Sequence, residues 1–155
     1  MLRRMSIFLL FSLTVLSSND FINSELHLIG TSKGELSPCP KSPNCVSTKS
    51  TNPSFAMTPL PYMGSRQESH ARLMRILGSM KRCTVITSRS QYLHLEFKST
   101  LLRFIDDVEF LFDNTERRIH FRSASRKGYY DFGVNRRRMR EISERYLHAG
   151  EKNYK

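Results

Sequence analysis

The stretches RFIDDVEFLF, residues 103–112, and RIHFRSAS, residues 118–125, alternate apolar and polar side chains over much of their length. Successive side chains of a β-strand point to opposite faces of the sheet, so this alternation predicts strands with one apolar and one polar face. The same pattern occurs in TVITS (84–88) and QYLHLEF (91–97), and short turn-like stretches separate the four segments. The sequence therefore predicts an antiparallel β-meander of about four strands.

Two further segments have a helical period. Ser65 and Glu68 form a capping box ahead of the first, and apolar residues then recur at helical spacing. We expect helices at 66–80 and 134–147. The buried side of the second is expected to consist of Met139, Ile142 and Tyr146. Two helices against one face of an antiparallel sheet make a two-layer α+β fold.

The other face of the predicted sheet carries polar side chains. They are Tyr92, His94, Glu96, Asp107, Glu109, His120 and Arg122. With the turns centred on the loops, His94 falls opposite Asp107, and Glu109 falls opposite His120 or Arg122. Directly opposed residues lie about 5 Å apart, so cross-strand ion pairs are the first interpretation. The spacing is not that of a known metal site, and no metal or cofactor is expected.

Strict alternation turns Asp106 toward the apolar core. An unpaired buried carboxylate is strongly destabilising, so either a β-bulge lifts Asp106 out or an arginine pairs with it. Arg103, Arg126 and the arginines at the start of the second helix are the available partners.

The connection SRKGYYDFGVN, residues 125–135, leads into that helix, whose first turn carries three arginines. A helix N-terminus is its positive end and disfavours cations, although Asp131 or Asn135 can cap it. The arginines either pair with the carboxylates of the protein or, with free helix N–H groups, bind an anion. The candidate binding residues are Asp106, Asp107, Glu109, Arg122, Arg126, Asp131, Asn135, Arg136 and Arg138.

The chain is strongly basic, with a formal net charge of +11. From residue 116 to residue 155, twelve Lys and Arg stand against five Asp and Glu, a net of +7. Such a field favours an anionic small molecule, a lipid surface or an acidic protein as partner. Nucleic acid is not expected, because the chain lacks an RNA-binding type of strand motif and its first residues indicate export.

Residues 1–18, MLRRMSIFLLFSLTVLSS, have the layout of a secretory signal peptide, with two arginines before an apolar run and small polar residues after it. The run of about ten residues is too short to cross a bilayer of ~30 Å as a helix. We expect export, to a periplasm or outside the cell, or attachment to the membrane through an uncleaved N-terminal segment.

Cys39 and Cys45 enclose the short loop PKSPN. Export supplies an oxidising compartment, so a disulfide is favoured over two free thiols or a metal pair. This loop lies in residues 19–63, which are rich in Ser, Thr and Pro and are expected to form an extended arm. The α+β domain is expected at 64–148 and a flexible tail at 149–155.

Three stretches resemble domain-of-unknown-function family 1499: SPCPKSPNCVST (37–48), RFIDDVEFLFD (103–113) and IHFRSASRKGYYDFGVNRRRM (119–139). The likeness runs from about residue 36 to residue 146. The family pattern falls on Cys39, Pro40, Ser42, Pro43, Asn44, Cys45, Asp106, Asp107, Glu109, Arg122, Ser123, Ser125, Arg126, Gly128, Asp131, Gly133, Asn135 and Arg138. Lys127 and Tyr130 depart from it. The resemblance implies a bacterial or plastid-type protein, often exported or membrane-attached, and implies no particular activity.

Two functions fit these patterns. The first is a small extracytoplasmic binding or interaction module, whose Arg/Asp/Asn site takes an anionic ligand or an acidic partner. The alternative is a hydrolase-like enzyme that uses Asp106, Asp107 and Glu109 as general acid and base. Asp106 and Asp107 are neighbours on a strand and point to opposite faces, so a shared site needs a β-bulge. The binding module is therefore favoured, and no residue is assigned as catalytic.

Overall fold

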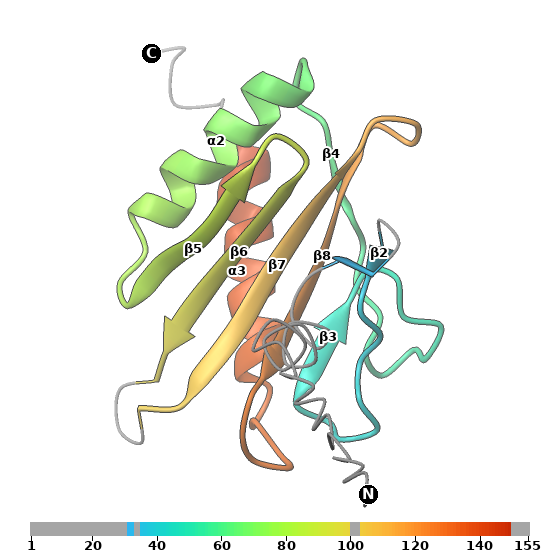
Figure 1. The fold of residues 1–155 in the computed structure, drawn as a ribbon, viewed down its shortest axis with the longest axis vertical. Helices are drawn as coiled ribbons and strands as arrows, with labels where there is room; N and C mark the ends of the chain where they lie inside the picture. Colours follow the sequence, from blue (N-terminus) through green and yellow to red (C-terminus); the bar gives the residue numbers. More distant parts are fainter. Residues whose placement is uncertain (1–30, 33–34, 100–102, 150–155) are drawn as a thin grey trace, which may run out of the picture.

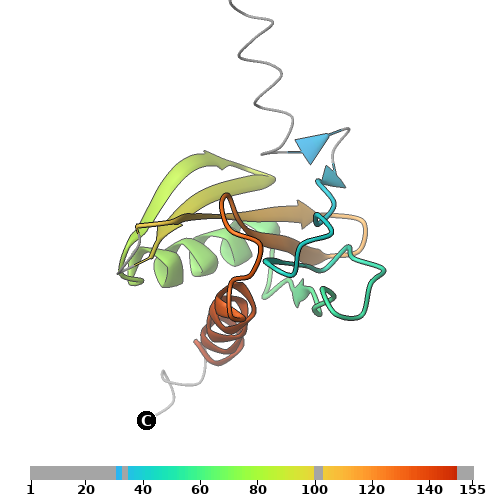
Figure 2. The same ribbon diagram turned by 90° about the horizontal axis from the view of Figure 1, so that it is seen from below.

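The computed structural model describes residues 31–32, 35–99 and 103–149. The predicted signal peptide, residues 1–18, lies outside the described residues, and so do residues 150–155 of the predicted tail. The main sheet is antiparallel, with both helices on one face (Figure 1, Figure 2). The predicted α+β class is confirmed, but the sheet has six strands where about four were expected.

The meander itself is confirmed. Its strands are β5 (Cys83–Arg89), β6 (Tyr92–Lys98), β7 (Ile105–Asp113) and β8 (Arg118–Ser125). Each pairs antiparallel with the next along the chain, and a register shift between Val85 and Thr87 marks a bulge in β5.

The strands that the sequence did not predict are short. They are β1 (Thr31–Ser32), β2 (Glu35–Leu36), β3 (Cys45–Ser47) and β4 (Leu60–Pro61). β3 and β4 both pair with β8, so they complete the six-stranded sheet from the segment expected to be an arm. β1 and β2 form a separate two-stranded sheet. Two or three residues are too few to show an alternating pattern in the sequence.

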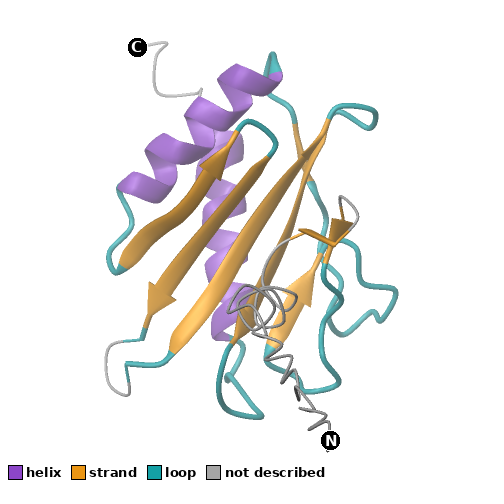
Figure 3. Cartoon of the chain, in the orientation of Figure 1, coloured by secondary structure: helices purple, strands orange, loops and turns teal. Residues whose placement is uncertain are grey.

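The helices are α2 (Arg66–Gly78) and α3 (Val134–His148), both drawn in purple in Figure 3. The capping box is confirmed: Ser65 Oγ accepts from the Glu68 N–H at 3.2 Å, and Glu68 Oε2 accepts from the Ser65 N–H at 2.7 Å. The first helix ends two residues earlier than predicted. Among the described residues, no helix is both long enough and apolar enough to cross a bilayer.

The core fills the space between the sheet and the two helices. The fully buried side chains include Leu73 and Leu77 from α2, Leu93 and Leu95 from β6, Val108 and Phe110 from β7, Ile119 and Phe121 from β8, and Met139, Ile142 and Tyr146 from α3. The hydroxyl of Tyr146 donates to the carbonyl of Pro61 at 3.1 Å, so this buried polar group is satisfied. The apolar faces predicted from the alternation are therefore the ones that pack.

One part of the predicted register is wrong. His94 lies opposite Glu109, and Glu96 lies opposite Asp107, a shift of two residues from the expected pairing. The connection between β6 and β7 runs from residue 99 to residue 104, and a loop of that length does not fix a register as a two-residue turn does. A shift of two leaves each side chain on its face, so the predicted core is unaffected. Of the two residues expected opposite Glu109, His120 and Arg122, the structure has Arg122.

Four connections meet at one end of the sheet, where the ends of several strands lie side by side. The pairing aligns Cys83 with Phe97, Phe97 with Asp106, and Asp106 with Ser125, so these residues lie in a row across the strands. We call this row, with the connections that join it, the lower edge, because it lies toward the bottom of Figure 1. The described parts of these connections are 79–82, 99 with 103–104, 126–133 and the disulfide loop 39–45.

Replacement of Ser65 by Ala is expected to lower the free energy of unfolding by about 1 kcal/mol, because α2 loses its capping hydroxyl. The measurement is the urea unfolding midpoint of the full chain. Ser90→Ala, at an exposed position in the β5–β6 turn, is the control and is expected to change the free energy by less than about 0.5 kcal/mol. Equal midpoints for the two variants would show that the capping bond contributes nothing.

Candidate functional site

The nine predicted binding residues fall into two groups on opposite sides of the sheet. Asp106, Asp131, Asn135, Arg136 and Arg138 lie on the helix side, around the start of α3. The polar face carries the other four, which are Asp107, Glu109, Arg122 and Arg126. Asp106 and Asp107 follow one another on a regular strand and so point in opposite directions. The nine residues therefore do not form a single site.

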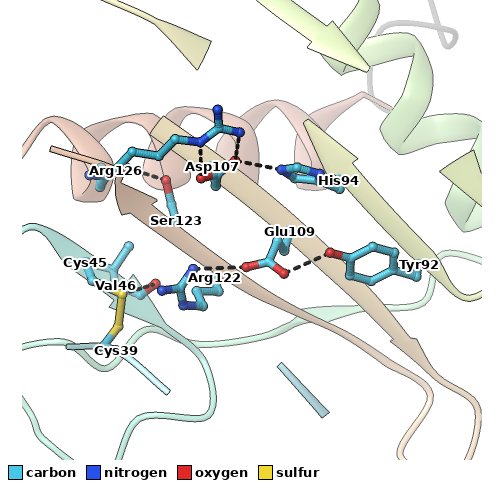
Figure 4. A network of polar contacts seen from close by, with 11 residues as sticks. Cys39, Cys45, Val46, Tyr92, His94, Asp107, Glu109, Arg122, Ser123 and Arg126 are labelled. Carbon is cyan, nitrogen blue, oxygen red and sulfur yellow. Dashed lines mark hydrogen bonds and ion pairs between the residues drawn. A yellow bond between two sulfur atoms is a disulfide. The ribbon is translucent and has the colours of Figure 1, made fainter. Parts of the chain in front are cut away.

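On the polar face, Asp107 accepts from His94 and from Arg126 (Figure 4). His94 Nε2 lies 2.7 Å from Oδ1, and Arg126 reaches both carboxylate oxygens, at 2.8 and 2.7 Å. Arg126 also pairs with Glu96. Burial acts to raise the pKa of Asp107, but the hydrogen bonds from His94 and Arg126 outweigh it and hold that pKa below its usual value. The hydrogen bonds that Arg126 donates to Asp107 and Glu96 raise the pKa of Arg126.

A second network on this face centres on Glu109, whose side chain is 0% exposed. Tyr92 donates to Oε1 at 2.8 Å and Arg122 donates to Oε2 at 3.0 Å. Burial and the neighbouring carboxylate raise the pKa of Tyr92, so its hydroxyl stays protonated and remains a donor. β2 lies against β7 and β8 on this side of the sheet (Figure 2). The polar face is thus a buried ion-pair layer rather than a wet surface.

On the helix side, the core-facing carboxylate of Asp106 has an arginine partner. Arg138 Nη2 donates to Asp106 Oδ2 at 2.6 Å, while the guanidinium stacks over the ring of Phe97, 4.7 Å from its centroid. β7 pairs with both neighbours without a bulge. Of the two solutions predicted for Asp106, pairing with an arginine is therefore the one found.

The other two arginines in the first turn of α3 bind carbonyl groups. Arg136 donates to the carbonyls of Ala56, at 3.1 Å, and Ser54. Arg137, which is exposed, donates to the carbonyl of Phe132 at 2.7 Å. The positive end of the helix is offset by Asp131, which accepts from the backbone N–H groups of residues 133 and 135. The predicted capping role of Asp131 is confirmed.

A cleft of about 600 Å³ opens beside Arg138 at the lower edge. Its walls come from residues 79–82, from residues 97–99 at the end of β6 and from α3 between Val134 and Arg145. The basic side chains that line it are Lys81, Arg82, Lys98, Arg137, Arg138 and Arg145. Glu141, the one carboxylate in the lining, pairs with Arg145. Within the described residues, Lys81, Arg82, Lys98 and Arg137 make no ion pair with a carboxylate.

Sequence reasoning missed the cleft, because three of its cations lie far from α3 along the chain. Lys81 and Arg82 precede β5, and Lys98 ends β6. The pairing of Cys83 with Phe97 places these residues at the same edge of the sheet. A predicted hairpin register was the signal that could have brought them together.

One group of described side chains could hold a metal ion. Asp113, Glu116 and His120 offer ligand atoms within 4.8 Å of one another. Each already has partners: Asp113 accepts from the N–H groups of Thr115 and Glu116, and His120 lies 3.1 Å from both Glu116 and Thr48. We therefore assign no metal to this group.

The geometry does not favour hydrolysis by the strand carboxylates. Asp106 lies on the other side of the sheet from Asp107 and Glu109, and each of the three has an arginine partner. Burial raises the pKa of the Cys83 thiol to about 11, so this cysteine is protonated at neutral pH and is a poor nucleophile.

Replacement of Arg138 by Ala is expected to lower the free energy of unfolding by about 3–5 kcal/mol, because it leaves the carboxylate of Asp106 buried without its partner. The check is urea unfolding of the full chain. Arg145→Ala, which breaks the exposed pair with Glu141, is the control and is expected to cost about 0–1 kcal/mol. Similar losses in both variants would contradict a buried ion pair.

Replacement of Asp107 by Asn is expected to destabilise the protein at pH 7 and to matter less in acid. The folded pKa of Asp107 is depressed, so its stabilisation is complete above an unfolded pKa of about 4 and is lost as the pH falls through the folded value. The urea unfolding midpoints of the variant and of the natural chain are measured at pH 7 and pH 3, and the difference between them is expected to be smaller at pH 3. Glu141→Gln is the exposed control, and a pH-independent difference for Asp107→Asn would rule out the linkage.

Comparison with known proteins adds one match. The model of the family described as "Protein of unknown function (DUF1499)" matches residues 35–145, which is more than half of the chain. Neither the curated proteins nor the solved structures contain a match. The matched region includes the disulfide loop, both ion-pair networks and most of α3. The chain therefore belongs to the DUF1499 family of proteins.

Proposed function

We propose that the protein is an exported binding module whose cleft at the lower edge takes an anionic group. One observation carries this proposal: four cations without carboxylate partners among the described residues surround a cleft of about 600 Å³. This volume lies within the range typical of small-molecule sites. The strand carboxylates cannot neutralise these cations, because they are committed to Arg122, Arg126 and Arg138.

The chemistry of the lining suits a phosphate or carboxylate attached to an apolar body. Arg82 and Arg137 present guanidinium groups that can bind such an anion through two parallel hydrogen bonds, and the lysines add point charges. Met80, Phe97 and Val134 contribute apolar surface to the same cleft. Arg138 is held by its ion pair with Asp106, so it forms part of the cleft wall and is not counted among the groups that bind the anion.

Export is part of the proposal. The N-terminal layout of two arginines, an apolar run and small polar residues supports it. The Cys39–Cys45 disulfide, with a Cα–Cα distance of 5.7 Å, supports it independently, since such bonds persist in oxidising compartments. Whether the N-terminal segment is removed does not alter the cleft, which is built from residues 79–145.

Thermal unfolding of the full chain with pyrophosphate tests the cleft. A ligand at 100 times its dissociation constant stabilises the folded state by about 2.7 kcal/mol, which raises the melting temperature by several degrees. We expect this rise in the natural chain and its loss in the double variant Lys98→Gln, Arg137→Gln. Sodium chloride at equal ionic strength is the control for general screening.

Arg140→Gln, Arg118→Gln is the matched control. Both side chains are exposed and neither lines the cleft, so this double variant loses the same charge elsewhere. It is expected to keep the rise in melting temperature. Equal losses in both double variants would mean that pyrophosphate responds only to total charge, and the proposed cleft would have to be abandoned.

A further inference from the structure

The connection between β8 and α3, residues 126–133, exposes three aromatic side chains. Tyr129, Tyr130 and Phe132 are 75%, 58% and 77% exposed. Single exposed apolar residues are common, but three within four positions on one loop form a patch that marks an interaction surface. We call residues 126–133 the aromatic loop. None of the internal networks described above uses these three rings.

The aromatic loop is held in place at both ends. The buried amide of Asn44 donates to the carbonyl of Gly128, and Asp131 accepts from the backbone N–H of Gly133 at 2.8 Å. Phe132 has a φ of +54°, a left-handed conformation that is rare for a bulky residue, and its carbonyl accepts from Arg137. Tyr130 and Phe132 pack edge to face, 5.1 Å apart. The rings are therefore presented by a braced loop.

Cations surround the aromatic loop. Lys127 in the loop is exposed, and the backbone N–H of Arg126 donates to the carbonyl of Ile105, which ties the loop to the start of β7, two residues after the exposed Arg103. The first turn of α3 comes directly after the loop, and its residues Val134 and Arg137 line the cleft described above. The carboxylates nearby are engaged: Asp131 by backbone N–H groups, and Glu96 by Arg126. The lower edge thus combines projecting aromatic rings with unneutralised positive charge.

We propose that the lower edge docks on an anionic lipid bilayer. The aromatic rings enter the boundary between headgroups and acyl chains, where amphipathic rings are favoured. The surrounding lysines and arginines bind headgroup phosphates. This inference rests on the proposed function, because it identifies the anion of the cleft as a lipid phosphate. A bilayer suits a projecting loop better than an acidic protein does, since a protein partner must supply a complementary hollow.

The chain contains no tryptophan, so a single introduced tryptophan reports on one position. In Tyr130→Trp the reporter lies in the aromatic loop. In Leu147→Trp it lies at an exposed position near the other end of α3, about 20 Å away at 1.5 Å per residue. Both variants keep the N-terminal segment, so any membrane affinity of that segment is common to the two.

Each variant is mixed with vesicles of phosphatidylglycerol and phosphatidylcholine, and with vesicles of phosphatidylcholine alone. We expect the fluorescence of Tyr130→Trp to shift to shorter wavelength with the anionic vesicles only. The fluorescence of Leu147→Trp is expected not to shift. Adding Lys98→Gln and Arg137→Gln to the Tyr130→Trp chain is expected to weaken vesicle binding by about thirtyfold, since two phosphate contacts are lost.

Three results would overturn the docking surface. The first is an unshifted Tyr130→Trp signal on anionic vesicles; if pyrophosphate still raises the melting temperature, the cleft stands and only the bilayer inference fails. The second is the absence of both effects, which removes the two proposals together. The third is an equal shift from Leu147→Trp, which indicates adhesion without orientation.

Discussion

The buried side-chain amide of Asn135 is the contact on which the lower half of the molecule depends. It is 0% exposed, and its oxygen accepts from Ser123 and from Arg138. Its nitrogen contacts the backbone carbonyl of Asn44 and the carboxylate of Asp131, both at about 3 Å. One side chain therefore joins β8, α3, the disulfide loop and the aromatic loop. A buried amide without partners is destabilising, so displacing any one of these four segments leaves part of this amide unsatisfied and favours keeping them together.

The buried ion pairs on the two sides of the sheet explain where the unneutralised positive charge of the protein lies. Asp106 binds Arg138 on the helix side, while Asp107 and Glu109 bind arginines on the polar face. These pairs neutralise the buried carboxylates, so they contribute little to the electrostatic potential at the protein surface. Lys81 and Lys98 consequently face the cleft without a nearby carboxylate among the described residues. The positive potential at the lower edge is thus a product of how the acidic residues are used inside.

Much of the fold could be predicted, because the alternation in β6 to β8 and the capping box at Ser65 are local signals. The unusual position of Asp106 could also be recognised in the sequence, since the alternation turns this charged side chain toward the apolar core. The strands β3 and β4 could not be predicted, because these short segments become strands only by pairing with β8. The site was predicted as one cluster and is divided by the sheet. Lys81 and Lys98 were missed, since only tertiary packing brings them to α3.

The two borders of the sheet differ in how they meet other molecules. At β8, the short strands β3 and β4 cap the border, and Pro61 in β4 offers no N–H to a further strand. At β5, the border strand exposes Val85 and Ile86, at 41% and 48%. The bulge at this point interrupts the regular spacing of backbone donors and acceptors that an added strand needs. The bulge thus protects an apolar border from strand-to-strand aggregation, and a deletion that removed it would favour fibre formation.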